Sequence, residues 1–189
     1  MGIKLGFAMC GSFCTFGKVI PFIEELKNSG MDIYPIMSFN AYNTDTRFGT
    51  AENFNSRVEK ICGKEIIHTL TTAEPIGPKN LIDALVIAPC TGNTLAKMAT
   101  GIADTPVTLA AKSTLRNANP VIIAISTNDA LSNAAKNIGN LMNYKNIYFV
   151  PYSQDDSENK PTSIVADFSK IKDTVLFALT GKQIQPIFR

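Results

Sequence analysis

The chain contains few of the residues from which metal sites are built. Its 189 residues include no tryptophan, one histidine and four cysteines, and no two cysteines follow a Cys-X-X-Cys spacing. Zinc sites need clusters of cysteine and histidine, so no metal centre is expected. We expect the four cysteines to be reduced thiols in apolar or loop positions.

Three further features are missing, and each excludes a class of protein. No apolar run reaches 18 residues, the net charge is only +2, and no signal-peptide layout precedes the first apolar run at 3–9. A membrane span needs such a run, nucleic-acid binding favours a strongly basic surface, and secretion needs a leader. These absences predict a cytoplasmic protein that binds neither membranes nor nucleic acid.

The composition is typical of a folded globular protein. Hydrophobic residues make up 45% of the chain and charged residues 18%. A chain of this length with this composition buries a sizeable core. We expect one domain that spans residues 1–189.

Apolar runs of strand length alternate with helical patterns along the whole chain. Strands are expected at 3–9, 32–37, 66–70, 84–88, 120–125 and 147–150, and helices at 16–29, 51–62, 106–115, 130–144 and 169–179. Residues 151–161 are expected to form a surface loop. Because parallel strands are joined by helical crossovers, the alternation predicts an α/β fold. The predicted fold is a three-layer, doubly wound, Rossmann-like (flavodoxin-like) parallel sheet with helices on both faces.

The most informative segment follows the apolar run at 84–88. Pro89 has no backbone N–H, so we expect it to end the strand. Small polar residues come next, and a helical pattern then runs to Gly101; these residues are Thr91, Gly92, Asn93 and Thr94. Free N–H groups and the helix dipole at such a junction attract anions and ligands.

Three other predicted strands end in similar residues. Gly11 and Ser12 follow the first strand, Ser38 the second, and Ser126 and Thr127 the fifth. Each residue alone could be an ordinary turn or N-cap residue. Parallel strands end at the same edge of a sheet, so small polar residues after four of these strands together indicate a binding site.

A mononucleotide fits these ends better than a dinucleotide. The loop at 6–17 lacks the Gly-X-Gly-X-X-Gly spacing, and the strand at 32–37 ends without the acidic residue that holds an adenosine ribose. A ligand with one phosphate is easier to accommodate. Flavin mononucleotide (FMN) is the leading candidate.

The segment at 88–104 and the Gly11–Ser12 loop resemble the flavoprotein family of homo-oligomeric cysteine decarboxylases and flavin prenyltransferases. Segments at 46–49, 73–79, 111–117, 126–131 and 146–151 narrow this resemblance to a branch that serves dipicolinate synthesis in spore-forming bacteria. The resemblance implies oxidation of a dihydro-dipicolinate to pyridine-2,6-dicarboxylate in the mother cell. It also implies a separate A subunit of the dipicolinate synthase, with an NAD(P) domain, and a trimer or dodecamer of this chain.

The resemblance also implies roles for individual residues. Gly11, Ser12 and Ser38 would lie near the flavin phosphate and ribityl chain. The flavin would also be contacted from the third and fourth polar strand ends, by Pro89, Thr91, Gly92, Asn93, Thr94, Ser126 and Thr127. Asn128 aligns with an asparagine of the decarboxylases' substrate motif and would hydrogen-bond the substrate.

A substrate with two carboxylates also needs cationic partners. Arginine pairs a carboxylate through two parallel hydrogen bonds, whereas lysine acts as a point charge. The cationic residues beside predicted strand ends are Arg47, Lys79, Lys97 and Arg116. Arg47, on the long polar segment after the second strand, and Arg116, at the end of a predicted helix, are the preferred candidates.

Two departures from the decarboxylase pattern leave other functions open. The decarboxylases place a histidine about a dozen residues before the Ala-Pro pair, but the single histidine, His68, lies further back, and the tryptophan of their substrate motif is missing. We expect His68 at the surface or at a strand end. The alternatives are a phosphopantothenoylcysteine-type decarboxylase or flavin prenyltransferase, and a non-catalytic flavin-binding or support subunit.

Overall fold

Five parallel strands form the centre of the molecule. The computed structural model describes residues 2–189. The strands are β1 (Lys4–Met9), β2 (Asp32–Met37), β3 (Ala84–Cys90), β4 (Val121–Thr127) and β5 (Ile147–Phe149), and they lie in the order β2-β1-β3-β4-β5. The order reverses direction between β1 and β3, which is where open α/β sheets bind ligands.

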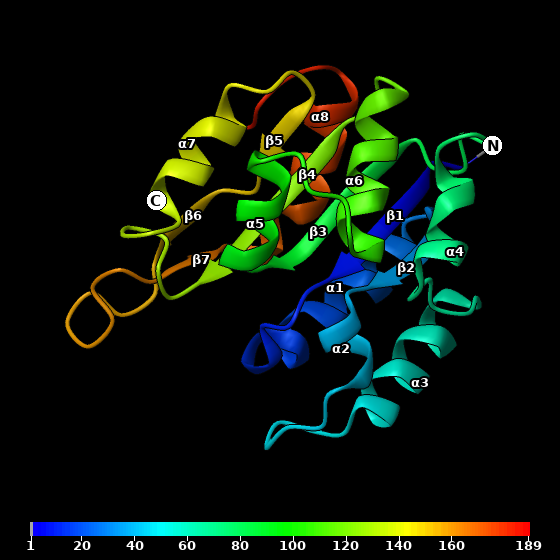
Figure 1. The fold of residues 1–189 in the computed structure, drawn as a ribbon, viewed down its shortest axis with the longest axis horizontal. Helices are drawn as coiled ribbons and strands as arrows, with labels where there is room; N and C mark the ends of the chain where they lie inside the picture. Colours follow the sequence, from blue (N-terminus) through cyan, green and yellow to red (C-terminus); the bar gives the residue numbers. More distant parts are fainter. Residues whose placement is uncertain (1) are drawn as a thin grey trace.

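Helices cover both faces of this sheet (Figure 1). On one face lie α1 (Phe16–Asn28) and α8 (Ile171–Leu179), and on the other lie α5 (Gly92–Ala99), α6 (Pro106–Arg116) and α7 (Ala135–Met142). The crossover from β2 to β3 contains α2 (Phe39–Asn43), α3 (Ala51–Cys62) and α4 (Leu70–Ala73). The predicted doubly wound, flavodoxin-like fold is confirmed.

Burial on both faces explains why the central strands are apolar. All seven residues of β3 are buried, and α1 buries Val19, Ile20 and Ile23, which recur at helical spacing. Burying one valine, leucine or isoleucine side chain of this kind stabilises the fold by about 1.5–3 kcal/mol. The core therefore lies along the sheet and fixes the strand ends relative to one another.

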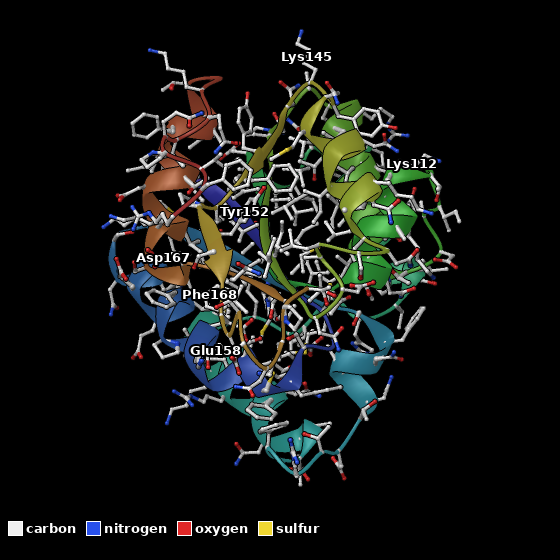
Figure 2. The ribbon with its side chains drawn as sticks, turned by 90° about the vertical axis from the view of Figure 1, so that its left-hand side faces the viewer. Lys112, Lys145, Tyr152, Glu158, Asp167 and Phe168 are labelled. Carbon is white, nitrogen blue, oxygen red and sulfur yellow. The ribbon has the colours of Figure 1, made fainter. Side chains whose placement is uncertain are left out.

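Two short antiparallel strands extend the sheet. β7 (Ile164–Ala166) pairs with the end of β4, where Ser126 faces Val165, and with β6 (Tyr152–Gln154). Figure 2 shows this extension, with Tyr152 on β6 and Asp167 and Phe168 just after β7. The prediction that 151–161 is only a loop is therefore wrong, because strands of three residues show too little alternation to be recognised. The extension supports the end of β4.

Two other element predictions are also wrong. In place of a strand at 66–70, one bridge joins Ile67 to Ile36, and the Thr69 side chain then caps α4 together with Thr72. The helix predicted at 130–144 begins only at Ala135. The turns before it are held by a hydrogen bond from the Leu131 N–H to the Thr162 carbonyl, 3.0 Å. In both places a local cap or a distant loop outweighs the apolar pattern.

Candidate functional site

The ends of β1, β2 and β3 are joined by backbone hydrogen bonds at one edge of the sheet. The Cys10 N–H donates to the Pro89 carbonyl at 3.1 Å, and the Ser38 N–H donates to the Met9 carbonyl at 3.0 Å. These bonds hold the loops that follow the three strands next to one another. We refer to the ends of β1, β2, β3 and β4 and the segments that follow them, residues 10–12, 38–40, 89–94 and 126–129, as the strand-end site.

Pro89 lies within β3 and does not end it. The strand continues to Cys90, which pairs with Ile125 of β4, and the pairing register shifts between Ile87 and Cys90. A bulge of this kind accommodates a residue that has no N–H to donate. The sequence prediction that Pro89 terminates the strand is wrong for this reason, although its carbonyl does help to position the β1 loop.

Two serines meet across the strand-end site. The Ser12 and Ser126 hydroxyl oxygens lie 2.9 Å apart, and Ser126 is only 5% exposed. A Cβ placed on Gly11 would lie 3.4 Å from the Phe13 ring and 3.6 Å from Cβ of Asn40. These are ordinary van der Waals distances, and because glycine has no side chain its backbone is accessible beside two hydroxyl groups.

Ser38 caps α2 and remains able to donate. Its hydroxyl oxygen accepts from the Ala41 N–H at 3.2 Å. Ser38 therefore has the ordinary N-cap role that the sequence left open for each small polar residue at a strand end. The hydroxyl proton of Ser38 is still available to a ligand at the end of β2.

The first turn of α5 has no side-chain cap. Thr91 stands at the N-cap, but its hydroxyl donates to the Thr94 hydroxyl at 3.4 Å, which in turn donates to the Cys10 sulfur at 3.2 Å. Within residues 2–189, the N–H groups of Gly92, Asn93 and Thr94 have no hydrogen-bond acceptor. The start of α5 therefore presents free donors, while Thr94 is turned into the interior.

Gly92 packs directly against the loop after β4. A Cβ on Gly92 would lie 2.7 Å from Oδ1 of Asp129 and 2.9 Å from Oγ1 of Thr127. Thr127 donates to that same Asp129 oxygen at 2.6 Å. Glycine is required here by this close approach. The sequence places Asp129 in the polar segment that ends β4, but it does not reveal the close approach to Gly92, which spans 37 positions of the chain.

The cysteines next to the site are buried thiols. Cys10 and Cys90 are each at most 1% exposed, and no cysteine forms a disulfide among the described residues. A hydrogen bond from Cys90 lowers the pKa of Cys10, whereas burial raises the pKa of Cys90. Both thiols lie in the core beneath the loops.

The structure does not bring the two predicted arginines to the strand-end site. Arg47 occupies the turn between Thr46 and Gly49, where its guanidinium lies over the Phe48 ring, 4.9 Å from the centroid. The segment between α2 and α3 that carries this turn projects away from the sheet (Figure 1). Arg116 ends α6 just before β4 begins, so it lies at the amino edge of the sheet, opposite the site.

Asn128 lies in the loop after β4, within the strand-end site, and His68 lies beside the end of β2. Asn128 is exposed after β4, and its carbonyl accepts from the Thr162 hydroxyl at 2.6 Å. His68 is half-buried and stacks on Tyr42, with ring centroids 3.7 Å apart and planes inclined by 3°. Its Nδ1 lies 2.9 Å from the Ile66 carbonyl. His68 therefore packs against α2, beside the end of β2.

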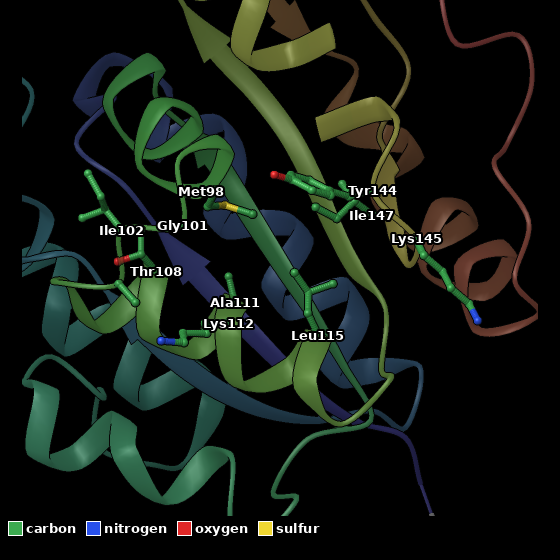
Figure 3. A pocket seen from close by; sticks show the side chains of 11 residues that line it. Met98, Gly101, Ile102, Thr108, Ala111, Lys112, Leu115, Tyr144, Lys145 and Ile147 are labelled. Carbon is green, nitrogen blue, oxygen red and sulfur yellow. The ribbon is translucent and has the colours of Figure 1, made fainter. Parts of the chain in front are cut away.

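An apolar groove lies outside the strand-end site. A groove of about 430 Å³ runs between α5, α6 and the segment before β5, and its walls include Met98, Leu115 and Ile147 (Figure 3). Leu115 and Ile147 lie near the amino ends of β4 and β5. The groove is therefore separate from the strand-end site.

Two classes of feature are absent from residues 2–189. No helix there is both long and apolar enough to cross a membrane. No group of three or more His, Cys, Asp or Glu side chains there could hold a metal ion.

A doubly wound sheet with small polar residues at four strand ends defines a class of ligand-binding α/β protein, and comparison with known families specifies it. A family profile described as Flavoprotein matches residues 1–180. The chain therefore belongs to the flavoprotein family.

Within this family the chain is similar to the B subunit of dipicolinate synthase. It is 45% identical to that protein from Bacillus subtilis (strain 168) over 186 residues, which cover 98% of this chain and 93% of the relative. The crystal structure of the B subunit of dipicolinate synthase from Bacillus halodurans C superimposes with a TM-score of 0.92 at 41% identity, covering 100% of this chain and 96% of that one.

The fold is shared more widely. Burkholderia xenovorans DmrB in complex with FMN, described as a cubic protein cage for redox transfer, has a TM-score of 0.69 at 19% identity, covering 94% of this chain and 96% of that one. At this identity the similarity shows a common fold.

Proposed function

We propose that this chain is an FMN-binding subunit of a dipicolinate synthase. It would act with an NAD(P)-binding A subunit to oxidise a dihydro-dipicolinate to pyridine-2,6-dicarboxylate during sporulation. The observation that supports this most directly is the convergence of Gly11, Ser12, Ser38 and Ser126 beside the uncapped start of α5. The similarity to the B subunit of dipicolinate synthase supports the choice of reaction.

The residues present fit a flavin with one phosphate. The accessible backbone of Gly11, next to the Ser12 and Ser126 hydroxyls, suits a phosphate and its ribityl chain. The free N–H groups of Gly92, Asn93 and Thr94 suit polar atoms of the ring system. When bound, the flavin would supply a two-electron acceptor, and the protein would contribute orientation and electrostatics.

Two residues are proposed to contact the substrate. Asn128 is exposed beside the site, and its side chain makes no hydrogen bond within residues 2–189, so it can bond a substrate atom. Arg47 is proposed to bind a carboxylate in the assembled enzyme, because its turn projects from the sheet. We expect Arg47→Ala to raise the KM of the assembled synthase for the dihydro-dipicolinate. If neither Arg47→Ala nor Arg47→Lys changes this KM, Arg47 does not bind the substrate.

The active form is proposed to be a homo-oligomer, a trimer or dodecamer, of single-domain chains in the mother-cell cytoplasm. A related fold forms a cubic cage. Light scattering of the purified chain measures the mass directly, and a monomer at micromolar concentration would contradict the proposal.

A spectrum taken during turnover tests the proposed reaction. The purified chain and the A subunit are mixed with FMN, a nicotinamide acceptor and freshly generated dihydro-dipicolinate, and both cofactors are followed by absorbance. We expect dipicolinate to form only when both proteins are present, with flavin bound to this chain. Full activity without flavin would reduce the chain to a supporting role. Release of carbon dioxide from a peptidyl cysteine would indicate a decarboxylase instead.

A further inference from the structure

An acidic side chain lies at the point where a helix start would otherwise attract anions. Asp129 is half-buried, and its Oδ1 accepts from Thr127 at 2.6 Å. The same oxygen would lie 2.7 Å from a Cβ on Gly92, the first residue of α5. No lysine or arginine among residues 2–189 forms a salt bridge with Asp129. The carboxylate instead lies beside the amino end of α5, which carries the positive end of the helix dipole.

This placement divides the strand-end site into two electrostatically different halves. An anion bound at the free N–H groups of α5 would lie a few ångströms from Asp129, and like charges at that distance repel. The Gly11–Ser12 loop instead offers the Ser12 and Ser126 hydroxyls. A carboxylate is an acceptor only, so it favours a ligand N–H or hydroxyl beside it.

We propose that Asp129 determines how the ligand is oriented in the strand-end site. It excludes the phosphate from the start of α5 and directs it to the Gly11–Ser12 loop. It also accepts a hydrogen bond from an uncharged N–H or hydroxyl of the ligand. The identity of the ligand as FMN rests on the proposed function, whereas the exclusion of anions rests only on the position of Asp129.

The exclusion of anions is tested without flavin. The full-length chain, Asp129→Asn and Asp173→Asn are titrated with inorganic phosphate, and the midpoint of thermal unfolding is recorded. Asp173 is on α8, so its variant controls for the loss of one negative charge. We expect phosphate to raise the midpoint of Asp129→Asn at least twice as much as that of the other two chains. Equal increases in all three would overturn the proposal.

The hydrogen-bonding role is tested with two flavins. Riboflavin lacks the phosphate, so its binding depends on the ring and ribityl contacts. We expect Asp129→Asn to bind riboflavin about tenfold more weakly than the natural chain, because a charged acceptor is lost. Unchanged riboflavin binding would overturn this half of the proposal.

A third variant separates charge from loop structure. Thr162→Val keeps the carboxylate but removes the hydroxyl that donates to the Asn128 carbonyl in the same loop, and we expect its phosphate response to match the natural chain. If it matches Asp129→Asn instead, the loop conformation and not the charge is responsible, and the proposal fails. Asp129→Ser repeats both tests if Asp129→Asn does not fold. Should the natural chain bind neither flavin, the proposed function fails, while the phosphate titration still decides on Asp129.

Discussion

Single hydroxyl groups are expected to decide how firmly the phosphate is held. Ser12 and Ser126 lie 2.9 Å apart, so both hydroxyls are positioned by the fold before any ligand arrives. We predict that Ser12→Ala weakens FMN binding about tenfold, because one charge-assisted hydrogen bond is lost. Riboflavin binding should change little. Ser56→Ala, on the exposed surface of α3, is the control, and fluorescence titration measures both ligands. Equal losses for FMN and riboflavin would place the phosphate elsewhere.

The four thiols are predicted to differ sharply in reactivity. Cys14 is exposed, whereas the other three are buried, and burial raises the pKa of Cys62 to about 12. The thiolate is the reactive form, so one thiol per native chain should react rapidly with a chromogenic disulfide at pH 8. Cys14→Ser should abolish this phase, and unfolding should release the remaining three. More than one rapid thiol in the native chain would contradict the burial described here.

For single residues, the sequence predicted the strand end at which each one lies better than it predicted the residues in contact with it. Gly11, Ser12, Ser38 and Ser126 could be placed at one edge because each follows a recognisable strand. The close approach of Asp129 to Gly92 was missed because the two residues are distant in sequence and no local pattern links them. Arg116 was placed wrongly although the predicted order of elements already excluded it, because a helix that ends just before a parallel strand ends at the amino edge of the sheet.

Among the elements, the junction of α5 with the β4 loop depends on one missing side chain. We predict that Gly92→Ala lowers the free energy of unfolding by about 1–2 kcal/mol, because the added methyl group displaces Asp129 and Thr127. It should also weaken flavin binding. Gly139→Ala is the matched control. It lies in α7 with no atom within 4 Å of the new Cβ, and it should stabilise the chain by about 0.5–1 kcal/mol. Denaturant titration measures both changes, and equal effects would contradict the account.

The start of β2 is tied to the segment after α3 by an ion pair, which predicts a pH dependence. A hydrogen bond from Lys64 lowers the pKa of Asp32 below its ordinary 3.8. A lowered carboxyl pKa contributes stability above the unfolded pKa, and this contribution is lost as the pH falls through the folded value. Asp32→Asn should therefore cost up to about 1 kcal/mol at pH 7. The cost should vanish well below pH 3.8 and shrink in 1 M salt. A cost that is the same at pH 7 and pH 2 would contradict this.

Element boundaries followed the sequence wherever a local signal fixes them. The helix predicted at 51–62 begins and ends as expected, because Thr50 caps its start and Gly63 adopts a left-handed conformation with φ +68° after its end. β6 and β7 were missed because each has only three residues and β7 pairs with the distant β4. The strand predicted to stop at Pro89 continues because a register shift absorbs the missing N–H.

For the whole molecule, the alternation of strands and helices was enough to predict the architecture, since a parallel sheet needs crossovers and handedness leaves few alternatives. The position of the groove between α5 and α6 could not be predicted, because it depends on how these two helices pack against the segment before β5 (Figure 3). The strand-end site was predictable because its position follows from topology alone. Which ligand it holds depends on side chains from four loops.

The crystal structure of this chain grown with FMN tests the central claim most directly. We predict one flavin per chain at the ends of β1 and β3, with its phosphate beside Gly11, Ser12 and Ser126 and its uncharged donors facing Asp129. A flavin bound in the groove between α5 and α6, or no flavin at saturating concentration, would contradict the account.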